Sequence, residues 1–180
     1  ADAGFLYAKR FGYKTDYLIG DFDTLDTMPD KDEVVEIIKY KIEKDDTDTM
    51  LAIKLALKKG CNTIIIFGAL GGRFDHTFAN LQALNYIAEN GGVGYIVSSS
   101  EFISIIPPGE YKFPQSKGYS FSAFSFSDSV EGVYETGFKY PLVNARLTSS
   151  FPLGACNEII NDFGMFSFKK GRVLIVISKI

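Results

Sequence analysis

Acidic side chains recur in three short stretches of the first half of the chain. Asp21 and Asp23 are separated by one residue, Asp45 and Asp48 by two, and Asp75 directly follows a glycine-rich stretch. Carboxylate oxygens are hard ligands that suit Mg²⁺, an ion that usually shares its coordination sphere with water and substrate phosphates. The three stretches together therefore predict a site for a magnesium–nucleotide complex.

The glycine-rich stretch adds groups that can bind phosphate. Arg73 carries a planar, permanently charged guanidinium that matches phosphate oxygens. Gly68, Gly71 and Gly72 lack a side chain, so the backbone there can approach a phosphate closely. Glycine-rich turns are common, and the prediction depends on their occurrence beside the acidic residues.

Each acidic stretch follows a predicted strand or opens a predicted helix. The apolar residues 17–19 precede Asp21, and a helix is expected over 48–59, with Asp45 and Asp48 on one side of its first turn. In parallel α/β proteins, ligands bind at the carboxyl ends of strands and the starts of helices. The elements expected over the first part of the chain are helix 4–11, strands 17–19 and 37–42, helix 48–59, strand 63–67, helix 75–89 and strand 94–98.

The period of the pattern changes at about residue 98. Beyond it the helical spacing vanishes, and short β-type runs alternate with turns such as Pro107-Pro108-Gly109. The expected strands are 102–106, 119–126, 130–135, 165–168 and 173–178. The sequence thus predicts an α/β domain with a parallel sheet over residues 1–97, followed by a C-terminal antiparallel β-sandwich over residues 98–180.

Composition excludes several other classes of protein. The chain has 180 residues, of which 46% are hydrophobic and 23% charged, as in ordinary globular domains. Its net charge of −3 argues against a nucleic-acid binder, which needs a basic surface. The longest apolar run, 63–70, is too short to cross a membrane.

Cysteine and histidine usage is sparse. The two cysteines, Cys61 and Cys156, do not make a disulfide framework, and no signal peptide opens the chain, so a cytoplasmic location is expected. The single histidine, His76, excludes a site with several histidine ligands in one chain. Alone, His76 is more easily explained as a structural hydrogen-bonding residue than as a base.

Taken singly, the other candidates also have structural explanations. Asp45 or Thr47 could cap a helix, and Asp21 and Asp23 could lie in a solvated turn. Three acidic stretches on one scaffold are harder to explain in this way, because carboxylates gathered without a cation repel one another.

Five motifs occur in an order that resembles the thiamine pyrophosphokinase family. They are Gly20-Asp21-Phe22-Asp23-Thr24, Lys44-Asp45-Asp46-Thr47-Asp48, Gly71-Gly72-Arg73-Phe74-Asp75-His76, Thr136-Gly137-Phe138-Lys139-Tyr140-Pro141-Leu142 and Cys156-Asn157-Glu158. The resemblance covers nearly the whole chain. It implies an enzyme that transfers the diphosphate group of ATP to thiamine, giving thiamine diphosphate and AMP, and a homodimer with active sites between its subunits.

The resemblance also assigns residues. Asp21, Asp23 and Asp45 match the metal and phosphate-site acids, and the catalytic set is completed by Asp48, Arg73 and Asp75. The nucleotide contacts are expected from Thr47, Gly71, Gly72, Arg73 and His76, and the thiamine contacts from Tyr140, Cys156 and Asn157.

Several positions depart from the family pattern. Thr24 stands where serine is frequent, Glu43 where aspartate opens the second motif, and Tyr140 where some members have tryptophan. Cys156 replaces the usual serine and loses a strong hydroxyl hydrogen bond. The chain begins inside the pattern, at residues 2–4, so the family's first strand and its glycine-rich turn are expected to be missing.

The chemistry of these residues also suits such a transfer when it is considered independently of the resemblance. Pyrophosphoryl transfer needs charge neutralisation and in-line positioning more than covalent help. Asp75 or Asp48 could orient or deprotonate the attacking alcohol, and the residues do not choose between them. Tyr140 could stack on a flat cation or be a core aromatic, and Asn157 could hydrogen-bond the pyrimidine or lie in a turn.

Other functional classes remain open at this stage. The run Asp21-Phe22-Asp23-Thr24-Leu25 resembles the opening motif of haloacid-dehalogenase phosphatases, which has one more residue between the second aspartate and the threonine. A non-catalytic nucleotide- and thiamine-binding protein is a second alternative. A purely structural pair of domains is a third, and it leaves the acidic residues unexplained.

Overall fold

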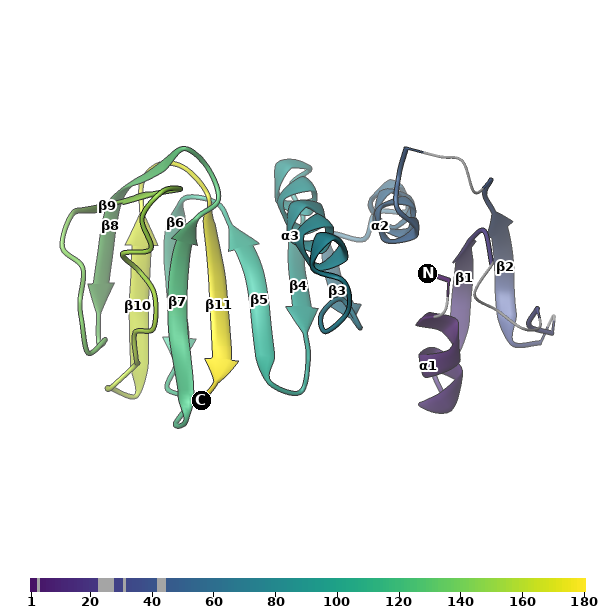
Figure 1. Ribbon diagram of the computed structural model, residues 1–180, viewed down its shortest axis with the longest axis horizontal. Helices are drawn as coiled ribbons and strands as arrows, with labels where there is room; N and C mark the ends of the chain where they lie inside the picture. The colour runs from purple at the N-terminus through teal and green to yellow at the C-terminus, as the bar shows by residue number, and fades with distance from the viewer. Residues whose placement is uncertain (3, 23–27, 31, 42–44) are drawn as a thin grey trace. The chain divides into compact units, whose positions relative to one another are not determined.

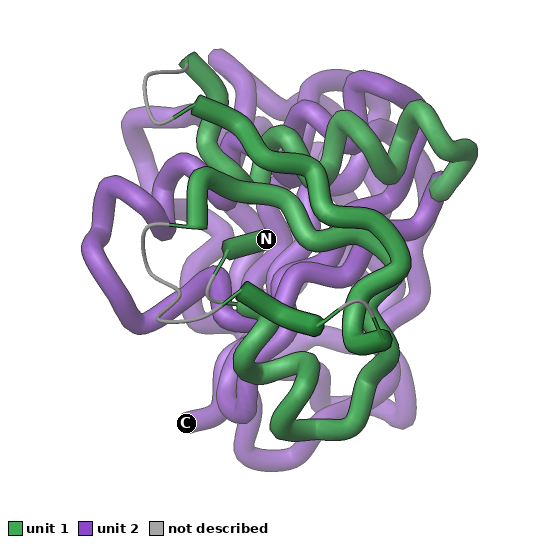
Figure 2. Tube along the Cα trace, turned by 90° about the vertical axis from the view of Figure 1, so that its right-hand side faces the viewer, with its two compact units in different colours: residues 1–61 green, residues 62–180 purple. Residues whose placement is uncertain are grey.

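The computed structural model of the protein describes residues 1–180 except 3, 23–27, 31 and 42–44. The chain divides into two units, residues 1–61 and 62–180, called here the N-terminal and C-terminal units (Figure 2). Asp23, a predicted metal ligand, and Thr24 and Glu43, which depart from the family pattern, fall outside the described residues.

The N-terminal unit is built around a pair of parallel strands. Helix α1 (Gly4–Arg10) precedes β1 (Thr15–Gly20), which pairs with β2 (Val34–Lys39) in register, with Ile19 opposite Ile38. Helix α2 follows β2, spans Asp48–Lys58 and contacts β1. A small apolar core holds these elements together and consists of Phe5, Leu18, Phe22 and Val34.

The C-terminal unit opens with a strand–helix–strand segment. Strand β3 (Thr63–Phe67) runs parallel to β4 (Val93–Val97), and helix α3 (Phe74–Glu89) connects them and contacts the sheet (Figure 1). Leu84 and Ile87 of α3 are fully buried, and Gly94 of β4 lies beneath them. Close helix–strand packing of this kind requires a residue without a side chain at Gly94.

Seven further strands complete the C-terminal unit. They are β5 (Glu101–Ile106), β6 (Gly109–Pro114), β7 (Tyr119–Ser125), β8 (Ser129–Thr136), β9 (Ala145–Thr148), β10 (Phe163–Phe168) and β11 (Val173–Lys179). One sheet has the order β3-β4-β5-β11-β7, and the other has the order β6-β10-β8-β9. All pairings among these seven strands are antiparallel.

The main core lies between these two sheets. Phe121 and Ile175 from the five-stranded sheet and Val133 and Phe166 from the four-stranded sheet belong to one buried cluster. The ring of Phe121 lies at its centre, 4.8 Å from the ring of Phe138 and 5.9 Å from that of Phe166, measured between centroids. Each such aromatic pair adds about 0.5–1.5 kcal/mol beyond the burial of its area.

The predicted fold class is confirmed in its coarse features and corrected in its details. The three helices of the described residues all lie before residue 90, and antiparallel strands dominate after it. The parallel strands, however, do not form one separate sheet. Strands β1 and β2 pair with each other, whereas β3 and β4 belong to the five-stranded sheet. Because β4 pairs antiparallel with β5, the strands before and after residue 98 share a sheet, and the units by contact divide at residue 61.

Individual elements differ from expectation at their ends. The strand predicted over 37–42 is β2 at 34–39, because Val34 already pairs with Thr15 of β1 and the last pair is Gly20 with Lys39. Strands β6 and β9 were missed. They are short, and β6 carries Glu110, Lys112 and Pro114, residues that are depleted in strands.

Among the described helices, none has the length and apolarity needed to span a membrane.

Gly137, which directly follows β8, has a backbone that only glycine fits. Its φ is +82°, and a Cβ atom added there would lie 2.4 Å from the carbonyl oxygen of Phe163. Gly118 has a similar φ of +79°, but a Cβ there would meet nothing within 4 Å. A comparison of alanine substitutions at the two positions therefore separates the energetic cost of backbone strain from that of a steric clash.

We expect Gly137→Ala to destabilise the protein by about 2–4 kcal/mol, the sum of left-handed strain and overpacking. The matched control Gly118→Ala should cost only about 1 kcal/mol, because it carries the strain alone. Urea unfolding followed by circular dichroism measures both values. Equal destabilisation by the two variants would contradict the close approach of residues 137 and 163.

Candidate active site

The first acidic stretches follow the carboxyl ends of paired parallel strands. Gly20 ends β1 opposite Lys39 at the end of β2, and the Tyr40 N–H donates to the Gly20 carbonyl over 3.0 Å. Asp21 leaves β1 at this edge and is half-buried. The chain that leaves β2 leads to Asp45 and then to α2, which contacts β1. The N-terminal unit thus places the described acids where α/β folds bind ligands.

The start of α2 assigns separate roles to its polar residues. The Thr47 hydroxyl caps the helix by accepting from the Met50 N–H over 3.2 Å. Asp48 is the first helical residue, whereas Asp45 is exposed and lies before the cap. The expectation that Asp45 and Asp48 share one side of the first turn is therefore wrong, because Asp45 is not in the helix.

Asp2 is an acidic residue that the sequence analysis missed. Its N–H donates to the Ile19 carbonyl over 2.8 Å, and its Oδ1 would lie 3.3 Å from a Cβ atom on Gly20. The pKa of the Ala1 amino group is lowered by burial and raised in part by the charges of Asp2 and Asp48. Asp2 and Asp48 thus lie near the same end of β1. In the sequence, the only signal for a role of Asp2 is its position directly before the first predicted helix.

The predicted metal ligands are only partly described. Within the described ranges, no three histidine, cysteine, aspartate or glutamate side chains gather closely enough to hold a metal ion. Asp23, the second of the three expected ligands, lies outside those ranges. The oxygen chemistry of Asp21 and Asp45 and their position after β1 and β2 fit a hard divalent cation.

The glycine-rich stretch forms the loop between β3 and α3 in the C-terminal unit. Gly68 and Gly71 have φ values of +71° and +88°, which other residues adopt only with strain. The Asn80 side chain of α3 donates to the Ala69 carbonyl over 3.0 Å and ties the loop to the helix. A Cβ atom on Gly72 would meet nothing within 4 Å, so the backbone there is open to approach by a ligand.

Arg73 and Asp75 form a two-bond ion pair at the start of α3. The Arg73 Nε donates to Asp75 Oδ1 over 3.1 Å, and its Nη2 donates to Oδ2. The hydrogen bond from Arg73 is the main cause that lowers the pKa of Asp75, and the His76 N–H, which donates to Oδ1 over 2.9 Å, contributes. Both side chains are exposed, so the pair orients the guanidinium without burying it.

The three predicted thiamine-end residues lie together in the C-terminal unit. Tyr140 is 64% exposed in the turn that follows β8, and Lys139 Nζ lies 5.8 Å from the centroid of its ring. Cys156 is exposed with φ +55°, and its N–H donates to the Ser122 hydroxyl over 3.0 Å. Asn157, by contrast, is buried and bonded to the main chain of Tyr140.

Glu135 is a second residue that the sequence analysis missed. It is only 2% exposed, and Asn157 Nδ2 donates to its Oε2 over 3.0 Å. Burial raises the pKa of Glu135 to about 7, and hydrogen bonds from the backbone of Leu142 and from Asn157 lower it in part. The available signal was a charged residue two positions after Val133, on the inward side of an alternating strand.

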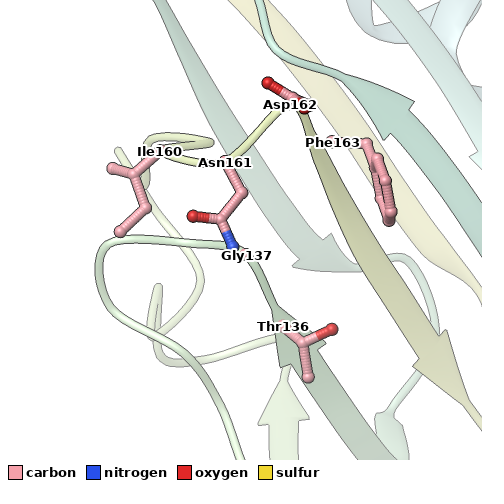
Figure 3. Close-up of a pocket in the computed structure, with 6 residues that line it drawn as sticks. All are labelled: Thr136, Gly137, Ile160, Asn161, Asp162 and Phe163. Carbon is pink, nitrogen blue, oxygen red and sulfur yellow. The ribbon is translucent and has the colours of Figure 1, made fainter.

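A hollow of about 590 Å³ opens beside the same turn. Thr136 and Gly137 line it from the end of β8, and the remaining lining residues come from the segment that enters β10: Ile160, Asn161, Asp162 and Phe163 (Figure 3). Tyr140, Cys156 and Asn157 are not part of its lining.

Two family models match the chain in succession. The thiamin pyrophosphokinase catalytic domain matches residues 1–92, and the thiamin pyrophosphokinase vitamin B1 binding domain matches residues 102–173. The chain belongs to the thiamine pyrophosphokinase family. A family relative from Bacillus subtilis is 34% identical over 97% of this chain and 80% of its own length.

Solved structures of this family have the same fold. Thiamine pyrophosphokinase from B. subtilis is similar with a TM-score of 0.88 at 30% identity, over 99% of this chain and 85% of that one. A family protein from Enterococcus faecalis is similar with a TM-score of 0.85 at 29% identity, over 99% and 86%. Family membership does not favour the phosphatase alternative.

The buried carboxyl of Glu135 generates a prediction about pH. Its folded-state pKa of about 7 lies above the ordinary value of 4.5, so the folded protein holds a proton that the unfolded chain releases. Glu135 therefore costs stability as the pH rises from about 4.5 to about 7. Over that range the free energy of unfolding of Glu135→Gln should rise relative to wild type, by up to about 3 kcal/mol.

Urea unfolding at several pH values measures this difference. Glu131→Gln is the matched control, because Glu131 lies on the same strand with a half-exposed side chain paired to Lys170. A constant difference between Glu135→Gln and wild type from pH 4.5 to 7 would mean that the carboxyl titrates normally.

Proposed function

We propose that the chain transfers the diphosphate group of ATP to the hydroxyl of thiamine, giving thiamine diphosphate and AMP. The observation that carries the proposal is that both family domains match in order over nearly the whole chain. The acids after β1 and β2 and the Arg73–Asp75 pair after β3 are groups that such a transfer uses. Residues 1–97 would serve the nucleotide and residues 98–180 thiamine.

The reaction forms a bond from the thiamine hydroxyl oxygen to the β-phosphorus of ATP. The bond from that phosphorus to the oxygen it shares with the α-phosphorus breaks, AMP leaves with that oxygen, and the hydroxyl proton passes to a carboxylate, for which the sequence offers Asp48 or Asp75. Asp21, Asp23 and Asp45 would hold Mg²⁺, which when bound neutralises phosphate charge. The nucleotide contacts would come from Thr47, Gly71, Gly72 and His76.

Arg73 would stabilise the charge that develops on the transferred group. Asp75 engages the guanidinium with both carboxylate oxygens, and its pKa is lowered chiefly by that contact. A carboxylate held in this way is a weak base. Asp75 therefore orients Arg73, and it is a poor candidate to accept the hydroxyl proton.

Tyr140 would stack on thiamine, a cation with a flat pyrimidine. Its exposed ring and the fixed main chain beneath it suit such a contact, which is worth about 0.5–2 kcal/mol. Cys156 would lie at the same end of the site through its position beside Asn157.

A homodimer in the cytoplasm is also proposed. The segments between β8 and β10 expose several large apolar side chains that a second copy would cover, namely Val143, Phe151, Leu153 and Ile160. Exposed apolar surface of this kind is typical of protein interfaces.

Asp23→Asn should abolish AMP release from ATP in the presence of thiamine and Mg²⁺, because the ion loses a charged ligand. The unfolding midpoint should not change. Asp16→Asn, at the exposed start of β1, is the matched control and should keep full turnover. Chromatography of AMP and thiamine diphosphate gives the result, and near-normal turnover by Asp23→Asn would remove the metal role.

Tyr140→Ala should raise the KM for thiamine by about 3–30-fold and leave the KM for ATP within twofold, because only thiamine loses the stacking surface. Tyr140→Phe keeps the ring and should stay close to wild type. Equal increases in both KM values for Tyr140→Ala would assign Tyr140 a purely structural role. Tight binding of ATP and thiamine by the wild type with no product would instead favour the non-catalytic alternative.

A further inference from the structure

The side-chain amide of Asn157 uses its whole hydrogen-bonding capacity inside the protein. Its Oδ1 accepts from the N–H groups of Tyr140 and Glu158, over 3.0 and 2.9 Å. Its Nδ2 donates to the Tyr140 carbonyl over 2.9 Å and to Glu135 Oε2 over 3.0 Å. An amide has two donor hydrogens and two acceptor lone pairs, so a bond to a ligand would require the loss of an internal one.

The orientation of this amide is fixed by its main-chain partners. The N–H groups of Tyr140 and Glu158 can only donate, so the atom that faces them is the oxygen. The Tyr140 carbonyl can only accept, so the atom that faces it is the nitrogen. The second hydrogen on that nitrogen then points to Glu135, whose carboxyl is an acceptor for it.

One side chain thus holds both main-chain polar groups of Tyr140. Binding of the N–H and the C=O of one residue restrains rotation on both sides of its Cα atom, and so fixes the direction of its Cα–Cβ bond. The Asn157 amide is 6% exposed and the Tyr140 ring is 64% exposed. A buried amide therefore fixes the main chain of a residue whose ring is exposed.

Glu135 holds the Asn157 amide from the core side. It occupies β8 on the same inward side as Val133, where an apolar residue would pack without the cost of burying a carboxyl. Its main-chain N–H also donates to the Leu142 carbonyl over 2.9 Å, which closes the turn that carries Tyr140. Glu135 thus holds the Asn157 amide through its carboxyl and closes the turn through its main-chain N–H.

We propose that Glu135 and Asn157 are positioning residues for thiamine: the Glu135 carboxyl fixes the Asn157 amide, which fixes the main chain of Tyr140 and so the point from which its ring projects. The proposal rests on the function proposed above. It assigns Asn157 an indirect role, in place of the direct hydrogen bond to the pyrimidine that the sequence suggested.

The first test compares Glu135→Leu with Glu135→Gln. Leucine removes the acceptor and leaves an Asn157 N–H unpaired in the core, so the Kd and KM for thiamine should rise about tenfold. The KM for ATP should stay within twofold. Glutamine keeps an oxygen for Asn157 and should keep thiamine binding within about twofold of wild type. Glu131→Leu, on the exposed side of β8, is the control and should change neither constant.

A second variant covers the case in which Glu135→Leu fails to fold. Asn157→Asp cannot donate to Tyr140 or Glu135 and brings two carboxyls together, so it should weaken thiamine binding about tenfold or more. Adding Glu135→Gln places an amide donor beside the introduced carboxylate. The double variant should bind thiamine more tightly than Asn157→Asp alone, a rescue that independent structural roles would not produce.

Calorimetry of thiamine binding keeps the test separate from turnover. Folded Glu135→Leu with unchanged thiamine affinity, equal losses for thiamine and ATP, or no rescue in the double variant would overturn the positioning role. A wild type that binds thiamine but makes no thiamine diphosphate would refute the proposed function and leave this test intact. A wild type that binds no thiamine would overturn both.

Discussion

The proposed thiamine end of this protein depends on one buried amide. Asn157 is surrounded by groups that satisfy each of its donors and acceptors, and two of its four bonds go to the main chain of Tyr140. In the low dielectric of a core, each of these bonds is strong and an unpaired group is costly. The arrangement is therefore stable only when complete, and it gives the turn after β8 a single conformation.

The remainder of the turn is built on the same principle of fixed anchors. Phe138 is buried against Phe121 in the main core, and Gly137 lies so close to the Phe163 carbonyl that no other residue fits. The Ile160 N–H donates to the Gly137 carbonyl over 2.9 Å. Between these anchors the ring of Tyr140 is free to meet a ligand, because the protein holds its main chain and leaves its side chain exposed.

The nucleotide end follows a different constraint. There the acids lie beyond the ends of parallel strands, and the glycine-rich loop lies between β3 and α3, so backbone topology brings functional groups to loop positions. Arg73 is restrained by Asp75 on the surface, where solvent screens the pair. The exposed pair can exchange partners with solvent or a bound anion, whereas the buried Asn157 and Glu135 have no solvent to exchange with.

Much of the fold could be predicted from local pattern. Helix α2 and strand β3 were placed to within one residue, because their periodicity, caps and flanking glycines agree. The sheet that joins β4 to β5 was not foreseen, since strand pairing across a change of period leaves no local signal. Strand β6 escaped detection because its pairing with β10 outweighs a poor strand composition.

The site was predicted unevenly for a similar reason. Exposed, chemically distinctive residues such as Arg73 and Tyr140 were found from motifs. Glu135 was not, because its role depends on Asn157, which lies 22 residues away in sequence, and only the fold brings the two together. The hydrogen-bonding state of Asn157 was equally inaccessible, so a residue expected to bind the substrate is one that holds another residue in place.

The most direct test of this account is the exchange of the Asn157 side-chain hydrogens with solvent, measured by ¹⁵N NMR with and without thiamine. Both hydrogens are bonded inside the protein, so both should exchange slowly and their signals should move little when thiamine binds. Rapid exchange of either hydrogen would show that the amide is not bonded inside the protein, and a large shift of its signals on addition of thiamine would show that Asn157 meets the ligand itself. Either result would contradict the account.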